Sequence, residues 1–139
     1  MNTRPVLLRL SLLLVLLLVQ CAPKAAPLST LDRDVSHKIV RDLHSQEGVV
    51  IVDVRQEREY AEGHIPGAFL IPLDQLPERI DEIPQEGRVV LVCRSGNRSD
   101  QAFRFLKQRG FQNIQNMIGG MNAWVQAGYE LAFCPGEDC

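Results

Sequence analysis

The chain has 139 residues, which is room for a single domain, and its 45% hydrophobic and 23% charged side chains are typical of a globular protein. A formal net charge of −2 at neutral pH excludes the strongly basic surface that binds nucleic acid. The cysteines and histidines are not spaced as zinc ligands, so we expect no metal site. The composition therefore predicts one globular domain that binds neither nucleic acid nor metal.

The first 20 residues have the pattern of a secretory signal peptide. Arg4 and Arg9 supply positive charge around the first apolar residues, and residues 10–19 then continue almost without polar side chains. This apolar run is too short for a comfortable transmembrane helix. We therefore expect an exported protein, with an uncleaved signal anchor as the alternative.

The predicted signal ends at Leu18-Val19-Gln20-Cys21, which resembles the lipobox of bacterial lipoproteins, although Gln20 stands where that motif usually has Gly, Ala or Ser. The resemblance implies cleavage before Cys21 and a membrane anchor through lipid on that cysteine. The domain would face the periplasm or the cell exterior. Ala22, which is not acidic, favours the outer membrane if the cell has one. A soluble exported protein is the alternative.

Residues 21–34 contain little that could form a core and are expected to be a tether between lipid and domain. Removal of residues 1–20 would take two of the 15 basic side chains and leave 13 against 17 acidic ones, a formal charge of −4. A mildly acidic domain has no electrostatic attraction to anionic lipid. The membrane is therefore expected to hold the protein without being its substrate.

Export changes the interpretation of the four cysteines, because disulfides persist outside the cytoplasm. Cys134 and Cys139 form a short C-terminal tail, 134–139, and lie close enough in sequence to pair with each other. With lipid on Cys21, such a disulfide would leave Cys93 as a free thiol.

Buried strands and amphipathic helices alternate from Val35 onwards. Apolar, mostly β-branched runs predict buried strands at 49–54 and 88–93, and we also expect short strands at 69–71 and 111–118. The spacing of apolar and charged residues predicts helices that start after Ser36 and that cover 56–62, 73–83, 100–109 and 121–127. Strands separated by helices predict an α/β domain, a small parallel sheet with helices on both faces. Ligands bind such sheets at the carboxyl ends of strands, where Asp53, Arg55 and Cys93 fall.

The strand that ends at Val92 delivers Cys93 into a short polar loop, Arg94-Ser95-Gly96-Asn97-Arg98, before a helix that Asn97 or Ser99 can cap. Unpaired N–H groups at a helix N-terminus favour anions, and nearby arginines lower the pKa of a thiol. Cys93 is therefore a candidate nucleophile. The alternative is a buried structural cysteine followed by ordinary loop residues.

Three separated motifs occur in order along residues 35–133. They are Asp53-Val54-Arg55 with Glu59-Tyr60 and Gly63-His64-Ile65-Pro66-Gly67-Ala68, then Cys93-Arg94-Ser95-Gly96-Asn97-Arg98-Ser99, and finally Gly119-Gly120-Met121 with Trp124. Together they resemble the motifs of the rhodanese-like sulfurtransferases, of the single-domain exported type. The resemblance covers essentially the whole expected folded part. It implies a rhodanese-like domain over 35–133 with Cys93 as the catalytic residue.

The resemblance also implies the chemistry. The Cys93 thiolate would take a sulfane sulfur from a small anionic donor, such as thiosulfate or a persulfide, and hold it as a persulfide. A thiol or another thiophilic acceptor, a protein among them, would then remove the sulfur, with no cofactor. The spacing from Cys93 to Arg98 matches these enzymes, whereas related phosphatases carry a loop one residue longer. Phosphate ester hydrolysis and arsenate reduction are therefore disfavoured.

Roles for the neighbouring residues follow from the same resemblance. The backbone N–H groups of residues 94–98 would bind the persulfide anion. Arg94 would meet the donor and Arg98 would hold the loop. Asp53 and Arg55 would support the site from the neighbouring strand end.

Two other functions remain open on the sequence. The domain could be a sulfur carrier or binding module in which Cys93 holds sulfur for a partner protein without turning over small acceptors. Alternatively, Cys134 or Cys139 could resolve the Cys93 persulfide in thiol–disulfide chemistry, although a local disulfide in the tail is the simpler interpretation.

Overall fold

The computed structural model of the chain describes residues 31–134. The predicted signal segment 1–20, the lipidation site Cys21 and the tail residue Cys139 lie outside the described residues, so the predictions that depend on them stay predictions. No helix within residues 31–134 has both the length and the apolar character needed to cross a bilayer.

Five strands form one sheet in the order β1-β5-β4-β2-β3, and every ladder in it is parallel. The strands are β1 (Asp34–Ser36), β2 (Val49–Asp53), β3 (Phe69–Leu70), β4 (Arg88–Val92) and β5 (Ile114–Ile118). β4 is the central strand, with β2 on one side and β5 on the other. The residue that follows β4, Cys93, therefore emerges at the middle of the carboxyl edge of the sheet.

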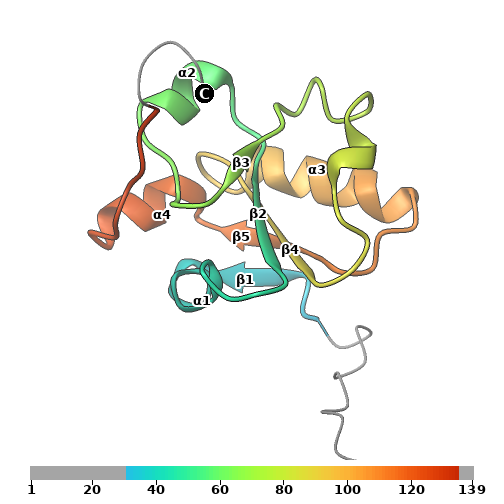
Figure 1. Ribbon diagram of the computed structural model, residues 1–139, viewed down its shortest axis with the longest axis horizontal. Helices are drawn as coiled ribbons and strands as arrows, with labels where there is room; N and C mark the ends of the chain where they lie inside the picture. The colour runs from blue at the N-terminus through green and yellow to red at the C-terminus, as the bar shows by residue number, and fades with distance from the viewer. Residues whose placement is uncertain (1–30, 135–139) are drawn as a thin grey trace, which may run out of the picture.

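Helices cover both faces of the sheet (Figure 1). They are α1 (His37–Leu43), α2 (Glu57–Ala61), α3 (Asn97–Gln108) and α4 (Gly120–Gln126), with a short 3-10 helix, η3, at Ile80–Glu82. α3 and the segment between β3 and β4 lie on one side, and α1, α2 and α4 lie on the other. The predicted α/β fold with a parallel sheet and helices on both faces is confirmed.

Two apolar clusters fill the spaces between the sheet and these helices. In one cluster Val89 and Leu91 of β4 pack against Leu106 of α3; in the other, Val90 of the same strand packs in a group with Trp124 of α4. Successive side chains of a strand point to opposite faces, so a strand covered on both sides must be apolar at every position. This explains the continuous Val-Val-Leu-Val run and the rigid placement of the loop that follows it.

Two predicted helices differ from the structure. The segment 73–83 contains turns and η3 but no α-helix, although Leu76 and Ile83 are buried as their spacing suggested. Three prolines at 72, 77 and 84 limit regular helical hydrogen bonding there. α3 begins three residues earlier than expected, with Gly96 as its N-cap at φ +102° and without a side-chain cap. The predicted capping roles of Asn97 and Ser99 are therefore wrong.

One strand has no counterpart among the sequence predictions. β1 pairs with β5, and Asp34 lies opposite Asn116. The preceding residues join the same edge, since the Gln115 side chain donates to the Asp32 carbonyl at 2.6 Å and the Asn116 N–H donates to the Arg33 carbonyl at 2.8 Å. Contacts with the sheet thus start at Asp32, within the range predicted as a tether.

Candidate active site

Cys93 follows β4 directly and its side chain is buried, with 1% of the residue exposed. Its Sγ accepts a hydrogen bond from the Gly96 N–H at 3.1 Å and lies 3.3 Å from the Ser99 hydroxyl. Cys93 is a free thiol. Three residues of loop and the start of α3 thus fold around one sulfur atom.

The surroundings of Cys93 favour its ionised form. Burial by itself raises the pKa of the thiol, because it removes water from the thiolate. The Ser99 hydroxyl and the backbone N–H groups of Ser99, Ser95 and Gly96 oppose this effect and outweigh it, so the pKa of Cys93 lies below its ordinary value. A lowered pKa increases the fraction of Cys93 that is thiolate at neutral pH, and the thiolate is the form that attacks electrophilic sulfur.

The first turn of α4 holds the Cys93 loop in place through hydrogen bonds to two of its backbone carbonyls. The Met121 N–H donates to the Cys93 carbonyl at 2.8 Å, and the Asn122 N–H donates to the Arg94 carbonyl at 3.0 Å. Gly120 makes this close approach possible. A Cβ atom there would overlap the Cys93 carbonyl oxygen and would lie 2.7 Å from the Arg94 carbonyl carbon. With these carbonyls held by α4, the loop presents its N–H groups to the sulfur.

Arg98 makes its contacts with α2 and not with the loop itself. Its guanidinium donates to both carboxylate oxygens of Glu59, at 2.6 and 2.7 Å. This bidentate bond is the largest cause of a shift that lowers the pKa of Glu59 to about 2, with a backbone bond from Gln56 adding to it and burial opposing it. Arg98 therefore ties the start of α3 to α2 across the carboxyl edge of the sheet.

Replacement of Glu59 with glutamine should lower the free energy of unfolding at pH 7 by about 1 kcal/mol, because the ion pair is partly exposed. The pKa of Glu59 is lowered from 4.5 to about 2, so its stabilising effect is complete above about pH 4.5 and is lost as the pH falls toward 2. As the pH falls from about 4.5 toward 2, the unfolding free energy of Glu59→Gln should therefore decrease less than that of the wild type. Urea unfolding at a series of pH values measures both effects.

Glu62→Gln is the matched control for this prediction. The Glu62 side chain pairs with Arg58, and these two side chains are 64% and 91% exposed. Such an exposed pair contributes little, so this variant should unfold like the wild type at every pH. Equal losses in the two variants would show that the Glu59–Arg98 contact has no special weight.

Asp53 ends β2, the strand next to β4, and Arg55 follows it by two residues, but the two side chains pair with each other. The Asp53 carboxylate accepts hydrogen bonds from Nε and Nη2 of Arg55 at 2.7–3.0 Å. The Arg55 guanidinium also donates to the Gly63 carbonyl at 2.9 Å. Both residues are buried. Their support of the site is thus indirect: Asp53 orients Arg55, and Arg55 holds the turn at Gly63.

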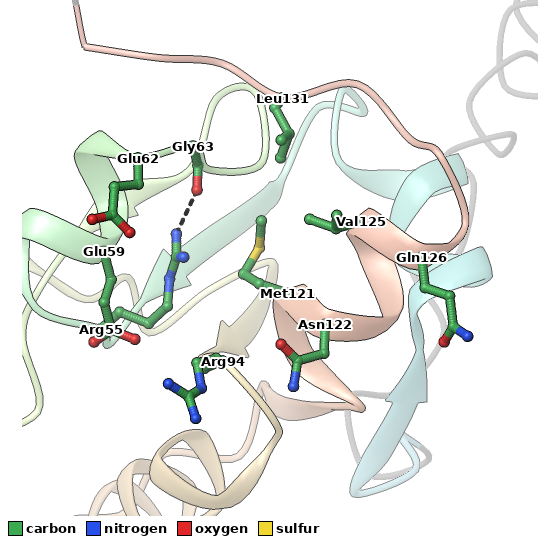
Figure 2. A pocket seen from close by; sticks show the side chains of 10 residues that line it. All are labelled: Arg55, Glu59, Glu62, Gly63, Arg94, Met121, Asn122, Val125, Gln126 and Leu131. Carbon is green, nitrogen blue, oxygen red and sulfur yellow. Dashed lines mark hydrogen bonds between the residues drawn. The ribbon is translucent and has the colours of Figure 1, made fainter.

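A cleft of about 500 Å³ opens beside the Cys93 loop (Figure 2). Its lining residues come from β2, α2, the loop, α4 and the C-terminal segment: Arg55, Glu59, Glu62, Gly63, Arg94, Met121, Asn122, Val125, Gln126 and Leu131. Figure 2 shows Arg94 on the loop at one end of this cleft and Leu131 at the other, with Met121 between them. Within residues 31–134 no hydrogen bond or ion pair engages the Arg94 guanidinium, which leaves its charge available to an anion.

The remaining predicted residues take different places. Ser95 and Asn97 are exposed and line a second, smaller hollow on the other side of the loop. Cys134 is disulfide-bonded, but because Cys139 lies outside the described residues, the predicted pairing of the two stays a prediction. Residues 31–134 contain no group of three or more His, Cys, Asp or Glu side chains that could hold a metal ion.

Two residues make contacts at the site that the sequence did not predict. Ser99 belongs to the quoted loop motif but was given only a capping role, whereas its hydroxyl lies against the Cys93 sulfur. Asn116 contacts Ser99 from β5. Its signal in the sequence is a pair of successive amides, Gln115 and Asn116, between apolar residues of a strand, and a buried amide needs a polar partner.

Residues 36–127 match the family described as "Rhodanese-like domain". The chain belongs to the rhodanese-like domain family. The three motifs quoted from the sequence all fall within, or at the edge of, the matched range. The predicted rhodanese-like family is thus confirmed, and the exported type stays a prediction.

Relatives of this rhodanese-like chain include proteins named as sulfurtransferases. A sulfurtransferase of Allochromatium vinosum is 41% identical over 96 residues, which cover 69% of this chain and 90% of the relative. The thiosulfate sulfurtransferase GlpE of Actinobacillus pleuropneumoniae is 30% identical over 90 residues, 65% of this chain and 83% of the relative. YrkF of Bacillus subtilis, whose name proposes a sulfur carrier role, is 39% identical over 81 residues, 58% of this chain and 44% of YrkF.

Solved rhodanese-like structures share the fold. The rhodanese-like domain protein of Staphylococcus aureus has a TM-score of 0.65 and 32% sequence identity, and the match covers 74% of this chain and 99% of that one. A rhodanese-related protein of Thermoplasma volcanium gives a TM-score of 0.68 at 27% identity, with 74% and 100% covered.

Proposed function

We propose that this rhodanese-like protein is a sulfurtransferase, which moves a sulfane sulfur from thiosulfate or a persulfide donor to a thiophilic acceptor through a persulfide on Cys93. The observation that carries the proposal is the Cys93 thiol, whose pKa is lowered by hydrogen bonds from its own loop. The named activities of the relatives support sulfur transfer as the reaction class.

The proposed reaction is a double displacement. The thiolate Sγ of Cys93 attacks the outer sulfur of thiosulfate; a new S–S bond forms, the S–S bond of thiosulfate breaks, and sulfite leaves with its electron pair. The negative charge then lies on the outer sulfur of the persulfide. An acceptor nucleophile attacks this outer sulfur, and Sγ leaves as the thiolate. The cycle requires no external oxidant, reductant or cofactor.

The residues around Cys93 favour each charged species in this cycle. Backbone N–H groups that are already oriented stabilise an anion without reorganisation, and the loop holds such groups against the sulfur. Arg94 lines the cleft and offers its charge to the sulfonate end of the donor. The apolar side chains of Met121 and Leu131 in the same cleft would limit access of water to the persulfide.

Steady-state kinetics with thiosulfate and cyanide test the proposed reaction. Double displacement predicts parallel reciprocal plots when one substrate is varied at several fixed concentrations of the other, with one sulfite released per thiocyanate formed. Intersecting plots would indicate direct transfer without an enzyme-bound sulfur. The absence of thiocyanate formation with thiosulfate and with every persulfide donor would contradict the proposal altogether.

Replacement of Arg94 with alanine should raise the KM for thiosulfate about tenfold, with a smaller effect on kcat, since a hydrogen bond to a charged partner is lost. Arg109→Ala is the matched control. Arg109 follows the far end of α3, where its guanidinium lies 4.4 Å from the centroid of Phe105. The Arg109→Ala substitution removes the same charge from the protein but should leave the KM for thiosulfate unchanged. An equal rise of the KM in both variants would indicate only a long-range influence of net charge.

A sulfur carrier is the second candidate function, and the similarity to YrkF favours it. A carrier would load one sulfur on Cys93 from thiosulfate in a single turnover but would transfer it to cyanide or small thiols very slowly. A sulfurtransferase would do both at comparable rates. Rapid-quench measurement of the two half-reactions therefore separates the two functions.

We further propose, from the sequence pattern of residues 1–21 alone, that the protein is exported and anchored through lipid on Cys21. The lipid would place the rhodanese-like domain at a bacterial membrane, facing the periplasm or the cell exterior. The mass of the N-terminal peptide from the native host would show acylation at Cys21. A peptide that begins at Met1 would contradict it.

A further inference from the structure

The Ser99 hydroxyl has more acceptors than protons. Its Oγ lies 2.7 Å from Asn116 Oδ1, 3.1 Å from the Gly96 carbonyl oxygen and 3.3 Å from Cys93 Sγ. Ser99 is fully buried, so water does not reach its hydroxyl, whereas Asn116 is 5% exposed and lines the smaller hollow beside Asn97. A hydroxyl donates one hydrogen bond at a time. Formation of one of these three bonds therefore prevents the other two.

The orientation of the Asn116 amide is fixed by β1. Its Nδ2 donates to Asp34 Oδ1 at 3.0 Å, which is a bond that a carboxylate can make only with the NH2 end. The amide oxygen consequently points to Ser99. Of the three acceptors, the Asn116 amide oxygen is nearest to Ser99 Oγ, at 2.7 Å, so it is the strongest competitor for the Ser99 proton when Sγ carries no charge.

We infer that Asn116 is a positioning residue, which competes with Cys93 for the single Ser99 proton and thereby favours the sulfur-loaded state over the free thiolate. This inference rests on the proposed function. In the free enzyme the charge lies on Sγ, and the Ser99 hydroxyl turns to it at the expense of Asn116. After loading, the charge lies on the outer sulfur, Sγ becomes a weak acceptor, and the hydroxyl returns to Asn116.

The consequence is a balance between two states of the enzyme. Ser99 makes a strong bond in the thiolate state and Asn116 offers a compensating bond in the persulfide state. Without Asn116 the thiolate would be overstabilised relative to the persulfide, and the loaded fraction at a given ratio of thiosulfate to sulfite would fall. Asn116 touches neither sulfur; it acts through Ser99.

Other charges around Cys93 stay in place when Asn116 is changed. They are Arg94 in the loop, Arg98 of α3 with its partner Glu59 of α2, Asp100 of α3 with its partner Arg33, and the pair of Asp53, which ends β2, with Arg55. Asp34 of β1 also keeps its charge but loses its hydrogen bond from Asn116. β5 and α4, which also pack against the loop, contain no charged residue. A change in the titration of Cys93 that requires Ser99 therefore reports on the Ser99 hydroxyl, whereas a change that persists without Ser99 would report on Asp34.

The test is the pH dependence of Cys93 alkylation by iodoacetamide in Asn116→Leu, which keeps the size of the side chain but removes the amide. Below the titration midpoint the variant should react about threefold to tenfold faster than the wild type, because one competing hydrogen bond is gone. The equilibrium loading by thiosulfate in the presence of sulfite should fall by the same factor. Asn116→Ala serves if the leucine variant does not fold.

Two further variants make the outcome specific. Gln115→Leu removes a neighbouring buried amide of β5, whose bond is to the Asp32 carbonyl, and should leave the alkylation profile unchanged. In a Ser99→Ala background, which alone should slow alkylation at low pH, Asn116→Leu should have no effect, because it acts only through the Ser99 hydroxyl. Slower alkylation in Asn116→Leu, or an effect that persists without Ser99, would overturn the inference.

Alkylation needs no sulfur donor, so this test is independent of the reaction proposed above. Faster alkylation in Asn116→Leu combined with no loading by any donor would support competition for the Ser99 proton and contradict the sulfurtransferase. Normal loading in both proteins with identical alkylation profiles would support the sulfurtransferase and contradict the role of Asn116.

Discussion

Replacement of Gly120 with alanine should lower the free energy of unfolding by about 2–5 kcal/mol and slow sulfur transfer in the same protein. Gly120 has φ +55°, a left-handed conformation that costs a residue with a Cβ about 1–2 kcal/mol. The added methyl group would also overlap the backbone of Cys93 and Arg94, and overpacking of this kind costs about 1–3 kcal/mol. Backbone atoms cannot rotate away as a flexible side chain can.

The loss of activity follows from the same overlap. To accept the methyl group, α4 must move away from the loop, which weakens the two bonds that its first N–H groups donate to the carbonyls of Cys93 and Arg94. The loop would then no longer hold its own N–H groups against the sulfur. Urea unfolding and the thiosulfate–cyanide assay on one preparation measure both effects.

Gly128→Ala separates conformational strain from overlap. Gly128 lies just beyond the other end of α4 with φ +70°, and a Cβ there would meet no atom within 4 Å. This variant should lose only about 1–2 kcal/mol of unfolding free energy, from strain alone, and should keep its transfer activity. If both glycine variants lost the same stability and kept full activity, the contact between α4 and the loop would not be what shapes the site.

Replacement of Cys93 with serine should reduce thiosulfate-dependent sulfite release by at least about 10³-fold, because the variant has no nucleophile that can form a persulfide. The fold should persist, since serine fits the same space and its hydroxyl can use the Gly96 and Ser99 contacts. Sulfite release measured together with unfolding by urea separates loss of chemistry from loss of structure.

Cys134→Ser is the matched cysteine variant. Cys134 packs beside the cluster that contains Trp124 and does not line the cleft beside the Cys93 loop. The sulfurtransferase predicts that its transfer activity stays close to that of the wild type. A loss comparable to that of Cys93→Ser would instead favour thiol–disulfide chemistry that uses the C-terminal tail.

Most of the sheet could be predicted, because a strand is recognised from a short stretch of consecutive residues. β2 and β4 are apolar runs that stand out against their surroundings, and alternation with helices makes parallel pairing the expected arrangement. β1 was not predictable, because three residues are too short to show a period and its place depends on backbone pairing with β5. The segment 73–83 shows the reverse error: helical spacing of apolar residues without a helix, where prolines interrupt it.

In the candidate site, too, the contacts between neighbouring residues could be predicted, whereas those between residues far apart in the sequence could not. The loop around Cys93 could be predicted because the cysteine and the N–H groups that surround its sulfur belong to consecutive residues between a strand and a helix. The partner of Arg98 is Glu59, 39 residues away, and Asn116 reaches Asp34 across 82 residues. Many carboxylates could satisfy an arginine, so only the packed structure selects one. The same reason keeps the competition for the Ser99 proton out of reach of the sequence.

The most direct test of the central claim is the intact mass of the protein after exposure to a panel of sulfane donors, thiosulfate among them. The protein is reduced beforehand and freed of excess reductant. The account predicts a gain of one sulfur atom, located on Cys93 by peptide mapping, removed by cyanide, and absent from Cys93→Ser. An unchanged mass with every donor, or a sulfur that remains in Cys93→Ser, would contradict it.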